Sequence, residues 1–361
     1  MRKLVHYAVI LAIALSLVSV GAVATSLSSR AAPVAAHHGP PYTIDLSNTS
    51  VNNGWRLEMQ SVARLFATTP KYSKLVKFRV VNAPNDVSSQ IQSLNAMIAQ
   101  HVDAILIDAD SPTALNPVID RATRQGIVVA SFDSLARDPN AYQIGVDLKK
   151  AAYTTALWLA KSMHGTGNLV INNGIMGTDG EALQNAGVKQ ALRQYPKIKI
   201  VAEFSGQWAT APSEAGMARL IATHPKIDGV WDSGGELGVI QALQNAHRKL
   251  IPIAGFPFNK YLQECVQLKA QGLKCGAASN PTTMSAMALQ EVVNVLQGKK
   301  VPKSTMLKYD LYTNNGVGSD VPATAIVQGK TTFRNLPDEF SFPYTLPGGT
   351  WTAQKVAAGM H

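Results

Sequence analysis

The chain has 361 residues, a formal net charge of +10, 46% hydrophobic residues and two cysteines. A chain of this length exceeds what one hydrophobic core usually serves, so two domains are predicted. The Lys and Arg residues are scattered and form no run longer than two, so the excess of positive charge does not indicate a nucleic-acid-binding surface.

The N-terminus has the order of a secretory signal peptide, because Arg2 and Lys3 precede an apolar run from Ala8 to Val23. We predict a signal peptide over residues 1–24, with cleavage at its end or as late as about residue 36. A membrane anchor is the alternative. No cysteine follows the run, so a lipid anchor has no attachment site there. The expected location is the periplasm, as an exported and soluble protein.

From Tyr42 onward, short apolar runs alternate with amphipathic stretches of helical length. This alternation predicts a parallel sheet with helices on both faces. The expected elements are strand 43–46, helix 55–67, strand 75–81, a helix opening at residue 85, strand 104–107, helix 117–125 and strand 127–132.

The same alternation restarts after Gly145, which predicts a second lobe of the same kind. Its expected elements are helix 149–163, strand 168–171, helix 181–195, strand 198–203, helix 213–223, strand 229–231, helix 237–246 and strand 251–255. The predicted fold class is therefore α/β, with two similar doubly wound parallel-sheet lobes.

Cys265 and Cys275 lie ten residues apart, and an exported protein meets oxidising conditions. We predict a local disulfide that clamps a helix to the following strand. The eight His residues do not cluster with these thiols, so no metal site is predicted. The chain also lacks phosphate-binding and hydrolase motifs, and no cofactor is expected.

Polar and aromatic side chains stand just after the predicted strands. Ligands of open α/β sheets bind at the carboxyl ends of the strands, so two facing lobes form a cleft between those ends. Amides, carboxylates and guanidinium groups pair with sugar hydroxyls, and aromatic rings cover the apolar face of a sugar ring. The candidate ligand-binding residues at strand ends are Ser47, Asn48, Asn53, Trp55, Arg56, Asp133, Ser134, Trp208 and Ser233. The alternatives are helix or turn capping for Asn53 and Asp133, and core packing for Trp208.

Three segments follow the order of the ribose-binding family of periplasmic proteins. They are Ile44-Asp45-Leu46-Ser47 leading to Asn53-Gly54-Trp55-Arg56, then the strand 127–132 followed by Asp133, then Ala254-Gly255-Phe256. The chain up to about Leu311 resembles these type I periplasmic sugar-binding proteins, and the Gly-Trp-Arg form is similar to their galactofuranose-binding branch. The resemblance implies that Asp133 forms hydrogen bonds with ring hydroxyls. It also adds Gln184, Phe256 and Asn280 to the candidate ligand-binding residues.

The resemblance also implies an architecture and a function. Three crossings near Gly145, Ser279 and Leu311 are expected to form a hinge between an N-terminal lobe (42–145 and 280–311) and a C-terminal lobe (146–279). Residues 312–361 lie beyond the resemblance and are expected to form a tail that packs on a lobe, with a mobile tail as the alternative. The expected function is that of a monomeric solute-binding component of an ABC importer, which closes on a sugar or polyol and presents it to permease subunits in the inner membrane.

The chain departs from the family pattern at charged positions. Ser134 replaces an arginine that commonly follows the aspartate, Pro257 replaces the acid of a Gly-Phe-Asp motif, and Gln184 is nearest to an expected second-lobe arginine. A non-sugar ligand and a sensor for a chemoreceptor or kinase therefore stay open. A carbohydrate-active enzyme using Asp133 with Glu203 or Glu236 is a further alternative, supported only by the presence of carboxylates.

Overall fold

The computed structural model describes residues 39–49, 51, 53–84, 86–341 and 352–360, so the predicted signal peptide lies outside the described residues. The first lobe is built from two separate parts of the chain. Its elements are β1 (Tyr42–Asn48), α1 (Gly54–Ala67), β2 (Val76–Asn82), α2 (Val87–Ala99), β3 (Ala104–Ile107), α3 (Asn116–Arg124), β4 (Val128–Phe132), β5 (Tyr142–Val146), α9 (Met284–Leu296) and β11 (Ser304–Leu307).

The second lobe is built from the intervening residues and from a later segment. Its elements are α4 (Leu148–Ser162), β6 (Thr166–Asn173), α5 (Asp179–Leu192), β7 (Lys197–Ser205), α6 (Thr210–Thr223), β8 (Gly229–Asp232), α7 (Glu236–Asn245), β9 (Ile253–Gly255), α8 (Asn259–Gln267), a 3-10 turn (Lys269–Gln271), β10 (Cys275–Ala278), β12 (Leu311–Thr313) and β13 (Ala323–Ala325). The strands and helices expected between residues 43 and 255 are present, with ends that differ by a few residues.

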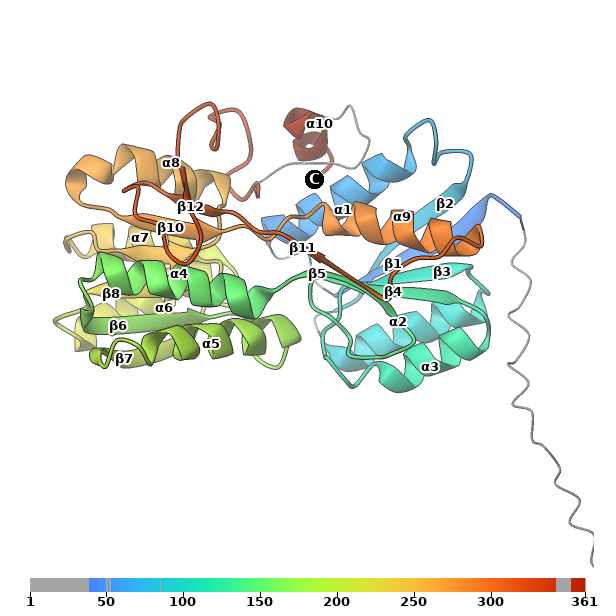
Figure 1. Ribbon diagram of the computed structural model, residues 1–361, viewed down its shortest axis with the longest axis horizontal. Helices are drawn as coiled ribbons and strands as arrows, with labels where there is room; N and C mark the ends of the chain where they lie inside the picture. The colour runs from blue at the N-terminus through green and yellow to red at the C-terminus, as the bar shows by residue number, and fades with distance from the viewer. Residues whose placement is uncertain (1–38, 50, 52, 85, 342–351, 361) are drawn as a thin grey trace, which may run out of the picture. The chain divides into compact units, whose positions relative to one another are not determined.

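The two sheets have five strands in the same order, to which each sheet adds at least one further strand at one edge (Figure 1). The first sheet runs β11-β5-β4-β3-β1-β2 and the second runs β13-β12-β10-β9-β8-β6-β7. Both therefore contain the order 2-1-3-4-5, counted from the first strand of each lobe, and these five strands are parallel. The predicted α/β class with two doubly wound lobes is confirmed.

Both faces of the central strands are buried, which explains the continuous apolar runs of these strands. In β3, Ala104 and Leu106 belong to the core shared with α1 and α9, whereas Ile105 and Ile107 belong to the core shared with α2 and α3. Alternate residues of a strand point to opposite faces, so an unbroken apolar run is the pattern that a strand between two helical layers requires. In the second lobe, α4 and α5 cover one face and α6, α7 and α8 the other.

The chain crosses between the lobes at three places. These are the junction of β5 with α4 at Asp147, the segment from Ser279 to Thr283 between β10 and α9, and the segment from Lys308 to Asp310 between β11 and β12. The last two crossings are hydrogen-bonded to each other, because Ser279 N donates to Asp310 O at 3.0 Å and Asp310 N donates to Ser279 Oγ at 2.9 Å. The crossings lie where the sequence predicted a hinge.

The region beyond Leu311 differs from the expected tail, because it begins with two strands of the second sheet. β12 pairs antiparallel with β10, and β13 pairs parallel with β12. The following residues pack on α8, where the Asn259 side chain donates to the carbonyls of Phe333, Leu336 and Pro337 at 2.8, 3.0 and 3.1 Å. Helix α10 (Ala353–Ala358) lies on α1 of the first lobe, where Ser61 Oγ donates to Val356 O at 2.7 Å.

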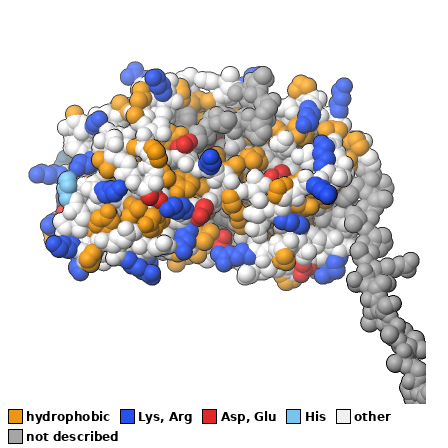
Figure 2. Space-filling model, viewed as in Figure 1, with side chains coloured by type: hydrophobic (Ala, Val, Ile, Leu, Met, Phe, Trp, Pro, Cys, Tyr) orange, Lys and Arg blue, Asp and Glu red, His pale blue; other side chains and the backbone are white. Residues whose placement is uncertain are grey.

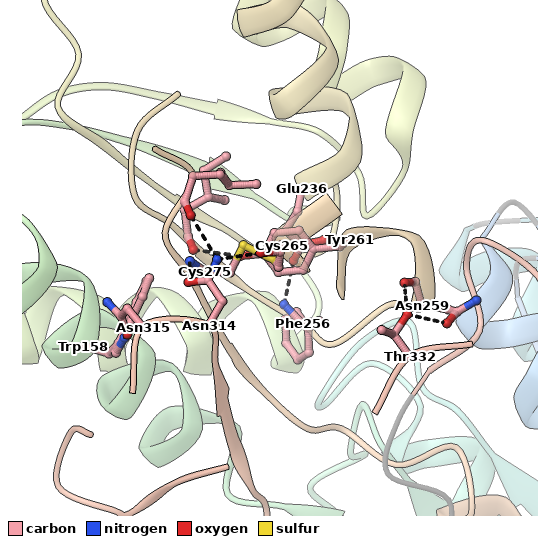
Figure 3. The surroundings of a disulfide bond; sticks show 12 residues. Trp158, Glu236, Phe256, Asn259, Tyr261, Cys265, Cys275, Asn314, Asn315 and Thr332 are labelled. Atoms are coloured by element: carbon pink, nitrogen blue, oxygen red, sulfur yellow. Dashed lines mark hydrogen bonds between the residues drawn. A yellow bond between two sulfur atoms is a disulfide. The ribbon is translucent and has the colours of Figure 1, made fainter. Parts of the chain in front are cut away.

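Cys265 of α8 and Cys275 of β10 are joined by a disulfide with a Cα–Cα distance of 5.8 Å. Asn314 occupies the loop that this bond closes (Figure 3). Its amide nitrogen donates to Cys265 O and Leu273 O at 2.8 and 2.9 Å, and its Oδ1 accepts from Cys275 N at 2.9 Å. The segment after β12 is thereby fastened to the disulfide loop.

Figure 2 shows Lys and Arg side chains distributed over both lobes on the face in view, with no concentration in one patch. Within the described residues, no helix combines the length and apolar character that a membrane span requires. The described part of the chain likewise contains no group of three or more His, Cys, Asp or Glu side chains placed to hold a metal ion.

Candidate functional site

A cavity lies between the carboxyl ends of the strands of the two sheets, with a volume of about 490 Å³ that includes space open to solvent. Helices α1, α4 and α5 and the loops after β4, β7, β8, β9 and β10 contribute to its walls. The lining residues are Asn53, Trp55, Arg56, Asp133, Ser134, Leu148, Gly180, Gln184, Trp208, Ser233, Gly234, Phe256, Phe258 and Asn280. Ten of the twelve residues selected from the sequence are among them.

Arg56 joins the ends of β1 and β3 on the first-lobe wall. Its guanidinium is 2% exposed, donates to Asn48 Oδ1 at 2.8 Å and to Thr49 Oγ1 at 3.2 Å, and lies 3.1 Å from Asp108 Oδ2. Burial raises the pKa of Asp108 to about 8, while the Arg56 charge acts in the opposite direction. The guanidinium is therefore held in one orientation by three partners before any ligand enters.

Asp133 is presented to the cavity by an unusual backbone conformation. Its φ is 57°, in the left-handed region that is uncommon for residues other than glycine, although aspartate adopts it more readily than most. Asn280 Nδ2 donates to Asp133 Oδ1 at 2.7 Å, and Trp55 Nε1 donates to Asn280 O at 2.7 Å. Burial raises the pKa of Asp133, opposed by the hydrogen bond from Asn280 and by the charge of Arg56.

Trp208 belongs to the second-lobe wall and also has a left-handed backbone, with φ 58°. Its Nε1 donates to Ser233 Oγ at 2.7 Å, and Ser233 Oγ donates to Gln184 Oε1. A Cβ atom on Gly174 would lie 2.0 Å from Trp208 Nε1, so a glycine is needed there to leave room for the indole. The ring is thus fixed by both a hydrogen bond and a steric boundary.

Two buried carboxyls support the second-lobe wall from behind. Asp232 Oδ1 accepts from the backbone N–H groups of Gly234 and Gly235 at 2.9 and 2.6 Å, and Glu236 Oε1 accepts from Phe256 N at 2.6 Å. Burial raises the pKa of Asp232 to about 6 and that of Glu236 further above its usual range. These carboxyls shape the loops that carry Gly234 and Phe256.

Ser47 and Asn48 differ from the sequence expectation, because both are fully buried and neither lines the cavity. The reason is that β1 continues through Asn48 instead of ending at Leu46, so these residues are still within the sheet. Asn48 Oδ1 orients Arg56, and Ser47 Oγ accepts from Gln90 Nε2 at 3.3 Å. Their place is behind the wall, in support of the side chains that form it.

Glu203 and Glu236, weighed from the sequence as catalytic partners of Asp133, do not line this cavity. Glu203 on β7 is paired with Lys189 at 3.1 Å, and Glu236 is committed to the Phe256 N–H. The arrangement around Asp133 is one of hydrogen-bonding and stacking groups, which suits recognition of a hydroxylated molecule.

Four lining residues were missed from the sequence, namely Leu148, Gly180, Gly234 and Phe258. Leu148 and Gly180 stand in the first turns of α4 and α5, and Phe258 immediately precedes α8. The signal that could have found them is their position after β5, β6 and β9, at the same sheet edge as the chosen residues.

A second cavity, with a volume of about 340 Å³ that includes space open to solvent, adjoins the first and shares Asn53, Trp208, Gly234 and Phe258 with it. Asp338 and Glu339 from the region after β13 contribute to its lining. Glu339 accepts a hydrogen bond from Gly54 N at the start of α1, and Lys260 N of α8 donates to Asp338 O at 2.8 Å. Asp338 therefore contacts the second lobe, and the next residue, Glu339, contacts the first.

Arg137 of the first lobe forms a further interlobe contact, an ion pair with Asp179 at the start of α5.

Glu58 of α1 provides a test of this packing. It is fully buried, with Oε1 accepting from Thr282 Oγ1 at 2.8 Å and Oε2 from Ser341 N at 2.6 Å, and burial raises its pKa from 4.5 to about 8. The folded protein then retains a proton that the unfolded chain releases, so this group lowers the free energy of unfolding as the pH rises from 4.5 to 8, by at most about 1.4 kcal/mol per pH unit. The free energy of unfolding of Glu58→Gln, measured relative to that of the native protein, should therefore increase steadily between pH 5 and pH 8. Urea unfolding of both proteins at the two pH values measures this, and an unchanging difference would contradict the assignment.

The chain was compared with known proteins. A model of the periplasmic binding protein domain matches residues 44–300. A xylitol-binding protein of Mycolicibacterium smegmatis is 32% identical over 190 residues, which are 51% of this chain and 54% of that protein, so the match spans about half of the relative's length. A ribose import binding protein of Bacillus subtilis is 25% identical over 275 residues, covering 75% of this chain and 87% of that protein. The crystal structure of an ABC transporter solute-binding protein from Thermobispora bispora superposes with a TM-score of 0.70 at 29% identity, covering 75% of this chain and 84% of that one.

Proposed function

We propose that this chain, which belongs to the periplasmic binding protein domain family, is the solute-binding component of an ABC importer for a sugar or polyol. The family is one of binding proteins, and the chain is similar to a xylitol-binding and a ribose import binding protein. Its proposed action is binding and delivery of a ligand to permease subunits, with no chemical step on the ligand.

The observation that carries the proposal is the cavity between the lobes. Hydrogen-bonding groups line it on the first-lobe side, namely Arg56, Asp133 and, from the adjoining crossing, Asn280. The aromatic rings of Trp208, Phe256 and Phe258 line it on the second-lobe side. A sugar or polyol combines hydroxyls with C–H surfaces, and these two kinds of wall match the two kinds of surface.

The proposed cycle uses the three crossings as a hinge. A ligand that contacts both walls binds the closed arrangement of the lobes more tightly than an open one, and this difference in affinity favours closure. The permease then distinguishes the closed, loaded protein from the open, empty one. A ligand that contacted only one wall would bind without transmitting its presence.

The test is a thermal unfolding screen of the chain lacking residues 1–36 against pentoses, hexoses, pentitols, amino acids and nucleosides. A ligand at 100 times its Kd should stabilise the folded protein by about 2.7 kcal/mol and raise the Tm accordingly. Stabilisation by a sugar or polyol, confirmed by calorimetric titration, is the expected result. Stabilisation only by amino acids or nucleosides would replace the proposed ligand class, and no stabilisation by any compound would overturn the proposal.

A further inference from the structure

The two walls of the cavity differ in the hydrogen bonds that they leave open to a ligand. On the first-lobe side, Asn280 Oδ1 is buried and has no hydrogen-bond partner within the described residues, while its Nδ2 is committed to Asp133. Asn280 is 8% exposed and lines the cavity. A buried acceptor without a hydrogen bond costs free energy. A ligand hydroxyl that donated to Asn280 Oδ1 would remove this cost and so strengthen binding.

The second-lobe side has its polar groups committed within the protein. The N–H groups of Gly234 and Phe256 donate to Asp232 and Glu236, and Ser233 N donates to Asn172 O at 2.9 Å. The Trp208 indole N–H donates to Ser233, whose hydroxyl donates to Gln184.

What this wall presents to the cavity is largely carbon. Leu148, Trp208, Phe256 and Phe258 supply its apolar surface. The polar part of this wall includes Gly180 and Gln184 of α5, whereas Phe256 and Phe258 belong to the loop between β9 and α8. Pro257, between these two phenylalanines, has no backbone N–H to offer.

We propose that the ligand is a deoxygenated sugar or polyol, with its hydroxyls on the first-lobe wall and a methyl or methylene carbon against Phe256 and Phe258. This inference rests on the proposed function and narrows its ligand class. A hydroxyl placed against the phenylalanines would lose its hydrogen bonds to water and gain none from the protein, which disfavours the hydroxylated analogue. The apolar carbon of a deoxy compound gains by the same burial.

The experiment compares matched pairs that differ by one oxygen atom. Calorimetric titration would give the Kd values of D-galactose and D-fucose, L-mannose and L-rhamnose, and D-glucose and 6-deoxy-D-glucose. The deoxy member of the pair with the right stereochemistry should bind at least about tenfold more tightly than its parent. Equal affinity or tighter binding of the hydroxylated members would overturn the inference while leaving the proposed function intact. No binding of any sugar or polyol, in these pairs or in the wider screen, would instead overturn the proposed function.

Two variants at one position locate the effect. Phe256→Asn supplies a hydrogen-bonding partner at the apolar wall and should reduce the preference for the deoxy member at least threefold. Phe256→Leu keeps the wall apolar and should retain the preference even where both affinities fall. A preference that is unchanged in Phe256→Asn would exclude Phe256 as the surface against which the deoxygenated carbon lies.

Discussion

Asp133→Ala should raise the Kd for the sugar or polyol by a factor of 100 or more. The Asp133 carboxyl lies in the cavity, is oriented by Asn280 and is near the charge of Arg56. Hydrogen bonds to a charged group contribute about 1.5–3 kcal/mol each, so two hydroxyls bound by one carboxylate correspond to about 3 kcal/mol or more. Calorimetric titration of the native protein and the variant measures the change.

The variant should remain folded, because Asp133 lines the cavity and belongs to neither lobe's hydrophobic core, although the variant loses the hydrogen bond from Asn280. Burial raises the pKa of Asp133, which means that the folded protein holds this carboxylate at a cost. Removal of the buried carboxylate opposes the loss of the Asn280 hydrogen bond and the cost of an alanine at φ 57°, so urea unfolding without ligand should show a free energy of unfolding within about 2 kcal/mol of the native value. Asp120→Ala is the matched control, since Asp120 lies in α3 of the same lobe, outside the cavity, and should leave the Kd unchanged. An Asp133→Ala protein whose Kd lies within threefold of the native value would remove Asp133 from the binding site.

Local sequence patterns predicted those parts of the cavity that follow directly from the positions of the strands. The run Ala104–Ile107 is buried on both faces, so its apolar character indicated a central strand and its end indicated the sheet edge at which ligands bind. Asn53 illustrates how two interpretations can both hold, because its side chain caps α1 by accepting from Arg56 N at 2.9 Å and the residue also lines the cavity.

The features of the site that the sequence did not predict depend on contacts between distant parts of the chain, which no local sequence pattern encodes. Ser47 and Asn48 were selected because they follow an apolar run, but pairing with Val81 and Asn82 of β2 extends the strand through them. The segment around Glu339 joins the second cavity through a backbone hydrogen bond between Lys260 and Asp338 and through the Glu339 carboxylate, which accepts from Gly54 N, and both contacts join residues far apart in the sequence. Phe258 reaches the cavity because of where the second lobe meets the first, and this meeting is a property of the assembled fold.

The loop between Cys265 and Cys275 leads to the second prediction with a large effect, because it links stability to the hinge. The disulfide closes this loop, and the strand that begins at Cys275 ends just before the crossing that carries Ser279 and Asn280. Closing a loop of about 11 residues restricts the unfolded chain by about 3 kcal/mol. The Cys265→Ala, Cys275→Ala double variant should lose roughly that amount of unfolding free energy.

Urea unfolding separates the stabilisation by the disulfide from other effects of the two substitutions. The proteins to compare are the native protein, the double variant, and the native protein with a phosphine reductant. The reduced native protein should approach the double variant in stability, and the reductant should not alter the double variant. Ligand affinity below the unfolding transition should change by less than about threefold, because Asn280 keeps its hydrogen bonds to Asp133 and Trp55 and the loop is also held by Asn314. A loss of unfolding free energy below 0.5 kcal/mol, well under the loop-closure value of about 3 kcal/mol, would mean that Asn314 alone holds the loop. A large loss of affinity in a fully folded double variant would mean that the disulfide acts on the hinge as well as on stability.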